Sequence, residues 1–186
     1  KPAPDVVVDD EGVRLPADQL RPFWSSFSHL VRNALDHGIE APADRKAAGK
    51  SEAGHIVLRA RNVPAGIVIE VIDDGRGIDW ERVRDKARAA GLPTETRAEL
   101  VDALFADGVS TAATVSQTSG RGVGLSAVRA AATEARGTVE VDSELGHGTR
   151  FAFTFSVSAL AARRRPATRR SLPPVISAML PVIKGD

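Results

Sequence analysis

Four clusters of polar residues and glycines contain the side chains that could do chemistry. In the first, Asn33, Asp36 and His37 lie four, seven and eight residues after His29, so one face of a helix would present all four together. An amide oxygen, a carboxylate and two imidazoles on one stripe could hold a hard cation and phosphate oxygens. An ordinary solvated helix face has the same pattern, so both interpretations stay open for this cluster alone.

The second cluster is Asp73-Asp74-Gly75-Arg76-Gly77, which directly follows the most apolar run of the chain. Glycines at the end of a strand let the backbone approach a ligand closely, and a carboxylate there can accept a hydrogen bond from an amino group. A tight turn explains the glycines equally well. A dinucleotide site and an EF-hand are both excluded, because G-x-G-x-x-G is missing and glycines occupy two of the EF-hand ligand positions.

Glycines also dominate the other two clusters. Gly120-Arg121-Gly122-Val123-Gly124-Leu125 leads into an expected helix, where unpaired backbone N–H groups and the helix dipole attract phosphate. It lacks the Lys-Ser or Lys-Thr pair of a Walker loop, and its glycine spacing is compatible with a phosphate cradle or a flexible hinge. The fourth cluster, Gly146-His147-Gly148-Thr149, needs no function beyond that of a hairpin turn.

Hydrophobic spacing predicts the elements that must position these clusters. A helical period begins at Asp18, tolerates Pro22 in its first turn and ends at Gly38, where a C-terminal glycine is favoured. We predict strands at 55–61 and 66–72, a hairpin of strands at 138–143 and 149–157, helices at 79–91 (capped by Asp79), 96–105 and 125–135, a strand or loop at 1–16, and a loop or short helix at 42–54. These elements predict an α/β fold, a two-layer sandwich with helices packed on one face of a mixed β-sheet.

Composition narrows the class of protein. The 186 residues include no cysteine, which excludes a disulfide scaffold, cysteine-ligated zinc and a cysteine nucleophile. No apolar run approaches the roughly 20 residues that span a bilayer, and no signal peptide is recognisable, so we expect a cytoplasmic domain. The stretch 161–186 carries six Lys and Arg against one acidic residue, or +5, which leaves 19 basic and 23 acidic residues, or −4, before it. Because this basic tail lacks aromatic residues that stack on bases, we favour a linker over a polyanion-binding segment and expect no nucleic-acid partner.

The order of the four clusters resembles that of a known family. A helix bearing Asn, Asp-x-Gly-x-Gly after a strand, a polar segment with Gly-x-Gly-x-Gly and then Gly-x-Gly-Thr together form the signature of the GHKL ATP-binding fold. Within it, residues 29–40 and 119–124 resemble the ATP-binding domain of chemotaxis-type histidine kinases, the CheA family, and Ser110-Thr111 resembles part of that family's Phe-Ser-Thr. The resemblance covers about residues 27–156.

The resemblance implies a role for each residue of these clusters. Asn33 would coordinate a Mg²⁺ ion that bridges the phosphates of ATP, and His29 would assist transfer of the γ-phosphoryl group. Asp73 would accept a hydrogen bond from the adenine amino group, in a network that includes Thr149. The other expected ATP-binding residues are Asp36 and His37 near the phosphates, Gly75 and Gly77 where the backbone would approach the nucleotide, Arg82 and Lys86 on the next helix, and Ser110, Thr111 and 120–125 in or beside a lid at about 106–124.

The resemblance also implies a reaction and its partners. Members that hydrolyse ATP, and anti-sigma serine kinases, carry an acidic residue at the position of His29, so the implied activity is phosphorylation of a histidine by Mg·ATP. The phosphoryl group would pass to a phosphotransfer domain in cis or in trans, and a CheW-like coupling protein and a response regulator would act through domains outside this chain. A degenerate module that binds nucleotide or a partner without kinase activity stays open, and a GHKL ATPase or anti-sigma serine kinase is less favoured.

Three segments are expected along the chain. Residues 1–17 would form a lead-in strand or loop, residues 18–158 the ATP-binding kinase domain, and residues 159–186 the basic tail or linker. The isolated domain is expected to be monomeric and to lack a membrane span.

Overall fold

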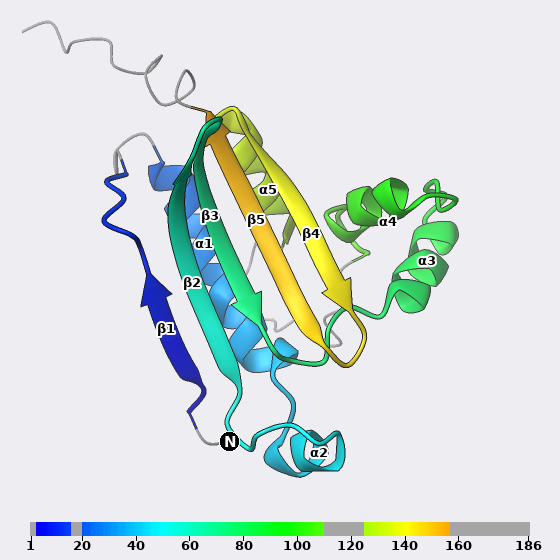
Figure 1. Cartoon of the computed structure of the whole chain (residues 1–186). Coiled ribbons are helices and arrows are strands. Elements are labelled where there is room, and N and C mark those ends of the chain that lie inside the picture. Colours follow the sequence, from blue (N-terminus) through cyan, green and yellow to red (C-terminus); the bar gives the residue numbers. More distant parts are fainter. Residues whose placement is uncertain (1–2, 16–19, 110–124, 157–186) are drawn as a thin grey trace, which may run out of the picture.

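A single mixed sheet forms the frame of the molecule in the computed structural model, which describes residues 3–15, 20–109 and 125–156 (Figure 1). Its strands lie in the order β1-β2-β3-β5-β4. β1 runs parallel to β2, and the other three neighbouring pairs are antiparallel. The strands are β1 (Asp5–Asp9), β2 (His55–Val63), β3 (Gly66–Asp73), β4 (Gly137–Glu144) and β5 (Gly148–Ser156).

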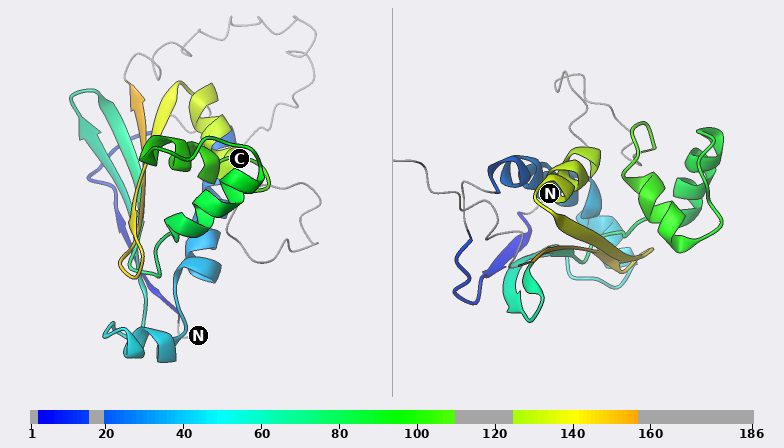
Figure 2. Two further views of the ribbon diagram at one scale, coloured as in Figure 1. Left: turned by 90° about the vertical axis from the view of Figure 1, so that its right-hand side faces the viewer. Right: turned by 90° about the horizontal axis from the view of Figure 1, so that it is seen from above.

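The main helices lie on one face of this sheet, with α2 beyond the strand ends (Figure 2). This arrangement confirms the predicted fold, an α/β sandwich with helices packed on one face of a mixed sheet. The helical elements are α1 (Arg21–Asn33), the π-helical turn η1 (Ala34–Gly38), α2 (Pro42–Ala47), α3 (Trp80–Ala89), α4 (Arg97–Leu104) and α5 (Leu125–Glu134).

Alternating residues of β5 build the core between the sheet and α1. Phe153 and Phe155 are fully buried, and the ring of Phe23 on α1 packs edge-on against them with centroid distances of 5.1 and 5.0 Å. Side chains two residues apart on a strand face the same side, so β5 presents a row of aromatic rings to the helix layer. Apolar residues of α3, α4 and α5 join the same core, which therefore fixes each helix relative to the sheet.

The helix starts follow their sequence signals. Pro22 lies in the first turn of α1, where its missing N–H costs nothing, as predicted. Asp79 caps α3 by accepting from the Arg82 backbone N–H, also as predicted. Thr96 and Glu99 form a reciprocal capping box at the start of α4.

The end of the first helix differs from the prediction of one continuous helix to Gly38. The α-helical ladder stops at Asn33 and a single π turn follows, in which the Ile39 N–H donates to the Ala34 carbonyl at 2.9 Å. Gly38 does end the helical segment, but it does not adopt the left-handed conformation of a glycine cap. Its carbonyl instead accepts the Arg76 N–H at 2.9 Å, so the loop after β3 holds this end of the helix.

Several predicted features lie outside the described residues. They include most of the proposed lid with Ser110, Thr111, Gly120, Arg121, Gly122, Val123 and Gly124, the boundary at residue 17 and the tail at 159–186. Within the ranges that are described, no helix combines the length and apolar character needed to cross a membrane.

Candidate functional site

A cavity of about 460 Å³ opens where the end of the first helix faces the loop after β3 and the start of β5. Apolar side chains form much of its wall: Leu30, Val71, Leu104, Leu125, Leu145 and Phe151. Polar and charged residues line the rest: Asn33, Asp36, His37, Asp73, Arg76, Asp79, Arg82 and Thr149. A concave site that combines apolar side chains with polar groups able to orient a ligand is the usual form of a small-ligand pocket.

Asp73 is the buried acid of this cavity. It is the last residue of β3, and its side-chain Oδ1 accepts the Gly75 N–H at 3.0 Å. Burial raises the pKa of the Asp73 carboxyl to about 6, against the lowering effect of backbone hydrogen bonds with Gly75 and Thr149. The carboxyl is thus fixed in place yet keeps acceptor capacity on the cavity side, where it can receive a hydrogen bond from a ligand.

Thr149 faces Asp73 across the β3–β5 pairing and belongs to a buried hydroxyl network. The Ser143 hydroxyl donates its proton to the Gly148 carbonyl at 2.8 Å and accepts the Ile78 N–H at 2.8 Å. Because that proton is used, the Thr149 hydroxyl, 3.0 Å from Ser143 Oγ, is the donor of their contact. Thr149 Oγ1 therefore keeps its lone pairs as acceptors at the cavity wall.

Glycines let three chain segments meet around the cavity. A Cβ added at Gly75 would lie 2.3 Å from the Gly38 carbonyl oxygen, and one at Gly77 would lie 2.1 Å from the Glu144 carbonyl oxygen. A Cβ at Gly148 would lie 2.0 Å from the Asp73 carbonyl oxygen. Neighbouring backbone fills the space beside each of these glycines. Close packing of the turn is therefore enough to explain why Gly75 and Gly77 are glycines. A contact between them and a nucleotide stays a prediction.

The structure brings together three of the four polar residues predicted on the first helix. Asn33, Asp36 and His37 line the cavity, with Asp36 and His37 exposed on the π turn. His29 is half-buried one turn before Asn33, and the described lining does not include it. Of the other predicted residues, Gly77, Arg82 and Leu125 line the cavity, whereas Gly75 and Lys86 do not.

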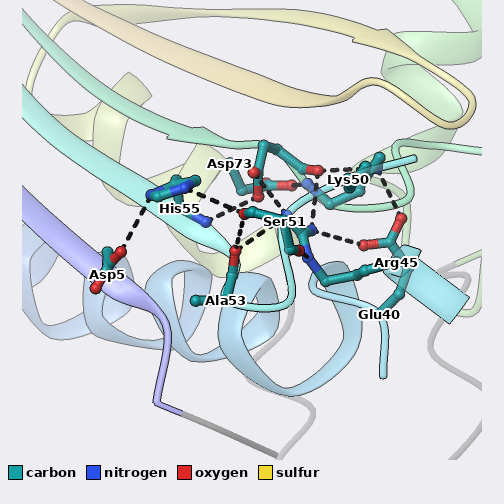
Figure 3. Close-up of polar contacts among 10 residues, drawn as sticks. Asp5, Glu40, Arg45, Lys50, Ser51, Ala53, His55 and Asp73 are labelled. Atoms are coloured by element: carbon teal, nitrogen blue, oxygen red, sulfur yellow. Dashed lines mark hydrogen bonds and ion pairs between the residues drawn. The ribbon is translucent and has the colours of Figure 1, made fainter. Parts of the chain in front are cut away.

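Sequence reasoning missed two further groups near the cavity. Arg76 and Asp79 line it, and the position of Arg76 between Gly75 and Gly77 was the available signal. Arg45 and Lys50 lie beneath the loop that follows Asp73, in a cluster with Glu40 (Figure 3). The segment 42–54 has no large apolar residue, and its charged residues give no signal that distinguishes a fully buried arginine from a solvated one.

Comparison with known proteins places these features in context. Residues 21–159 match the family model described as histidine kinase-, DNA gyrase B-, and HSP90-like ATPase. The chain is 45% identical over 150 residues to the chemotaxis protein CheA of Treponema pallidum, covering 78% of this chain and 18% of that relative. It is 48% identical over 125 residues to the chemotaxis protein CheA of Klebsiella aerogenes, covering 66% of this chain and 19% of that relative. The chain thus spans about a fifth of the length of these curated relatives.

A solved structure shows a similar fold. The blue-light activated histidine kinase of Erythrobacter litoralis EL346 superposes with a TM-score of 0.53 at 18% identity, covering 87% of this chain and 38% of that chain. At this identity the likeness concerns the arrangement of sheet and helices alone.

Proposed function

The chain belongs to the histidine kinase-, DNA gyrase B- and HSP90-like ATPase family, and we propose that it is the ATP-binding catalytic domain of a chemotaxis-type histidine kinase. In this proposal it binds Mg·ATP in the cavity described above and transfers the γ-phosphoryl group to a histidine of a separate phosphotransfer domain. The buried Asp73 carboxyl in a cavity whose wall is partly apolar and partly polar is the observation that carries the proposal.

Base recognition accounts for the chemistry of the inner wall. Apolar side chains such as Val71 and Phe151 suit the faces of a purine, while Asp73 supplies an acceptor for an exocyclic amino group. A 6-oxo purine presents an acceptor at that position instead of a donor, which would place two acceptors against each other and leave the carboxylate without a donor on its cavity side. Such a mismatch is costly, so we infer that the cavity prefers adenine to guanine.

The donor set of the cavity fits Mg²⁺ held together with a polyphosphate. Within the described residues no group of three or more His, Asp or Glu side chains could hold a metal alone. Asn33 and Asp36 offer one or two oxygen ligands, which is the usual protein share when Mg²⁺ also binds phosphates and water. Asn33 would hold the ion, which when bound neutralises charge on the phosphates.

The remaining side chains would position and neutralise the triphosphate. Arg76 and Arg82 line the same cavity and present guanidinium groups suited to phosphate oxygens. In the transfer, a nitrogen of the acceptor imidazole bonds to the γ-phosphorus while the bond to the bridging oxygen breaks and ADP leaves. Such transfers depend mainly on positioning and charge neutralisation. His29 lies one turn before Asn33, and we assign it a role that assists this transfer.

The longer relatives suggest where this domain acts. The proposed partners are a histidine phosphotransfer domain, in cis or in trans, and, through domains outside this chain, a CheW-like coupling protein and a response regulator. We propose the cytoplasm as the location.

A phosphotransfer assay tests this proposal. With γ-labelled radioactive ATP, Mg²⁺ and a separate histidine phosphotransfer domain, the chain should label that domain, and the label should be lost in acid. Asn33→Ala should lower the transfer rate by about tenfold or more, since a contact to a charged group is worth about 1.5–3 kcal/mol. Asn62→Ala, the same change at an exposed position of β2, serves as the control and should match wild type.

Two results would contradict the proposal. Acid-stable label would favour the serine kinase alternative, and release of free phosphate without labelling of the added domain would favour an ATPase.

A further inference from the structure

We propose that Arg45 and Lys50 are positioning residues for base recognition, which hold the Asp74–Gly75 and Gly75–Arg76 peptide groups and so orient the Asp73 carboxyl toward the ligand. The inference rests on the proposed ATP site, whose base-recognising group is Asp73. Neither cation lines the cavity, so each would act through the loop that it holds.

Arg45 is fully buried on α2, and each of its five N–H groups has an acceptor. Two bonds reach the residue after Asp73: Nη2 donates to Asp74 Oδ2 at 2.8 Å and Nη1 donates to the Asp74 carbonyl at 3.3 Å. A third reaches Glu40 Oε2 at 3.1 Å, and the other two reach the carbonyls of Ser51 and Ala53. Figure 3 shows the Arg45 side chain among Glu40, Ser51 and Ala53. Arg45 therefore ties the segment between α2 and β2 to the loop after β3.

Lys50 holds the same loop from one residue further on. Its Nζ donates to the Asp74 carbonyl at 2.9 Å, to the Gly75 carbonyl at 2.7 Å and to Glu40 Oε1 at 2.7 Å. These three bonds use all the N–H groups of the ammonium. The two cations thus fix the carbonyl groups of two successive residues, Asp74 and Gly75.

Because peptide groups are planar, the hydrogen bonds to these carbonyls also determine where the N–H groups of the same peptides point. The Asp74 carbonyl and the Gly75 N–H belong to one rigid peptide group, so fixing the carbonyl also aims the N–H, which donates to Asp73 Oδ1 at 3.0 Å. The next peptide group joins the Gly75 carbonyl, held by Lys50, to the Arg76 N–H, which donates to the Gly38 carbonyl at 2.9 Å. Lys50 is therefore linked through one peptide to the Asp73 carboxyl and through the next to the end of the π turn.

Arg45 and Lys50 also balance the negative charge of the acidic residues around the loop after β3. Glu40 and Asp74 are acidic neighbours of the loop, and each would raise the pKa of Asp73. Burial opposes the charge on both, but hydrogen bonds from Lys50 to Glu40 and from Arg45 to Asp74 keep their pKa values below the ordinary range. Removal of Lys50 would leave this acidic pair less compensated next to Asp73. The other charged or titratable groups that line the cavity around Asp73 are Asp36 and His37 on the π turn, Arg76 and Asp79 in the loop, and Arg82 on α3.

The test uses Lys50→Met, because Lys50 is partly exposed, whereas removal of the fully buried Arg45 would leave the Asp74 carboxylate without its cation and the Ser51 carbonyl without the donor that Arg45 supplies. Calorimetry would measure the affinities of Mg·ATP, Mg·GTP and inorganic tripolyphosphate. Lys50→Met should reduce the preference for ATP over GTP by about tenfold, the effect of one hydrogen bond to a charged group, and should leave tripolyphosphate affinity unchanged. Arg61→Met is the matched control, since it also removes a cation from a buried carboxylate, Glu70, and should leave the preference unchanged.

A nucleotide-free readout separates this inference from the proposed function. A ¹³C NMR titration of the Asp73 carboxyl should give a higher pKa in Lys50→Met than in wild type and no change in Arg61→Met; Lys50→Gln replaces Lys50→Met if the latter does not fold. An unchanged pKa and an unchanged ATP preference would overturn the inference, as would an equal loss of ATP and tripolyphosphate affinity. Wild-type protein that binds no nucleotide would overturn the proposed function, while the titration would still decide whether Lys50 positions Asp73.

Discussion

Asp73 faces opposite demands from folding and from ligand binding. As the proposed acceptor of an amino group it should be ionised, yet burial makes the ionised form costly and raises its pKa from 3.8 to about 6. At neutral pH the folded domain therefore carries a charge that its surroundings disfavour. Binding residues often lower the stability of a fold in this way, because function rather than stability determines the residue type.

This cost predicts that Asp73→Asn stabilises the fold at neutral pH. Because the folded-state pKa lies above the unfolded one, the ionised carboxylate destabilises the fold above about pH 6, less so between about pH 6 and 4, and not below. A pKa raised from 3.8 to about 6 corresponds to about 3 kcal/mol. Urea unfolding at pH 7.5 should show a gain of about 2–3 kcal/mol for the variant, vanishing below about pH 4.

The control for this measurement is Asp9→Asn, the same chemical change at the end of β1, where Asp9 is half-buried and pairs with Arg59. It should give no such gain. Equal unfolding free energies of wild type and Asp73→Asn at both pH values would contradict the assigned pKa.

Single residues also show where sequence reasoning stops. Asp73 was predictable because an acid followed by two spaced glycines after an apolar run is a recognisable pattern. Arg45 and Lys50 were not, because their importance comes from carbonyl groups that lie 24 to 29 residues away along the chain. Only the folded backbone brings those carbonyls within reach.

At the scale of elements, the turn between β4 and β5 closes one side of the cavity. Gly146 and Gly148 both have positive φ angles, of 87° and 105°, but only at Gly148 would an added Cβ meet another segment, the end of β3. Alanine substitution at Gly146 would therefore introduce backbone strain alone, whereas substitution at Gly148 would add a steric clash.

We predict that Gly148→Ala destabilises the domain far more than Gly146→Ala. An alanine at Gly146 would meet no atom within 4 Å and should cost about 1 kcal/mol of backbone strain. An alanine at Gly148 would place its Cβ 2.0 Å from the Asp73 carbonyl oxygen, so β3 and β5 must separate there, at a cost above about 3 kcal/mol. Thermal unfolding of both variants checks this, and similar melting temperatures would argue against the close strand approach.

The elements themselves were largely predictable, with one instructive exception. Periods of two and 3.6 residues, together with caps such as Asp79, indicated the strands and most helices. The π turn after Asn33 was missed because its cause is tertiary: the loop after β3 binds the Gly38 carbonyl. The turn changes the direction in which Asp36 and His37 project, so a single helical stripe from His29 to His37 was too simple.

At the scale of the whole molecule, strand order creates the site. β3 and β5 are far apart in sequence but adjacent and antiparallel in the sheet, so the end of one meets the start of the other at the Asp73–Thr149 pair. The sequence alone indicated a mixed sheet, but the β1-β2-β3-β5-β4 order was not predicted, since period and turn signals do not define pairing between distant strands. Once that order is formed, the first helix, the loop after β3 and the hairpin turn enclose one cavity.

The most direct test of the account is calorimetric titration of Mg·ATP into wild type, Asp73→Asn and the control Asp9→Asn. Wild type and Asp9→Asn should bind alike, and Asp73→Asn should bind about tenfold or more weakly, since it loses a hydrogen bond to a charged acceptor worth about 1.5–3 kcal/mol. Because Asp73→Asn is expected to fold at least as stably as wild type, unfolding would not explain the loss. Equal affinity of all three proteins, or no binding by wild type, would contradict an ATP site in which Asp73 recognises the base.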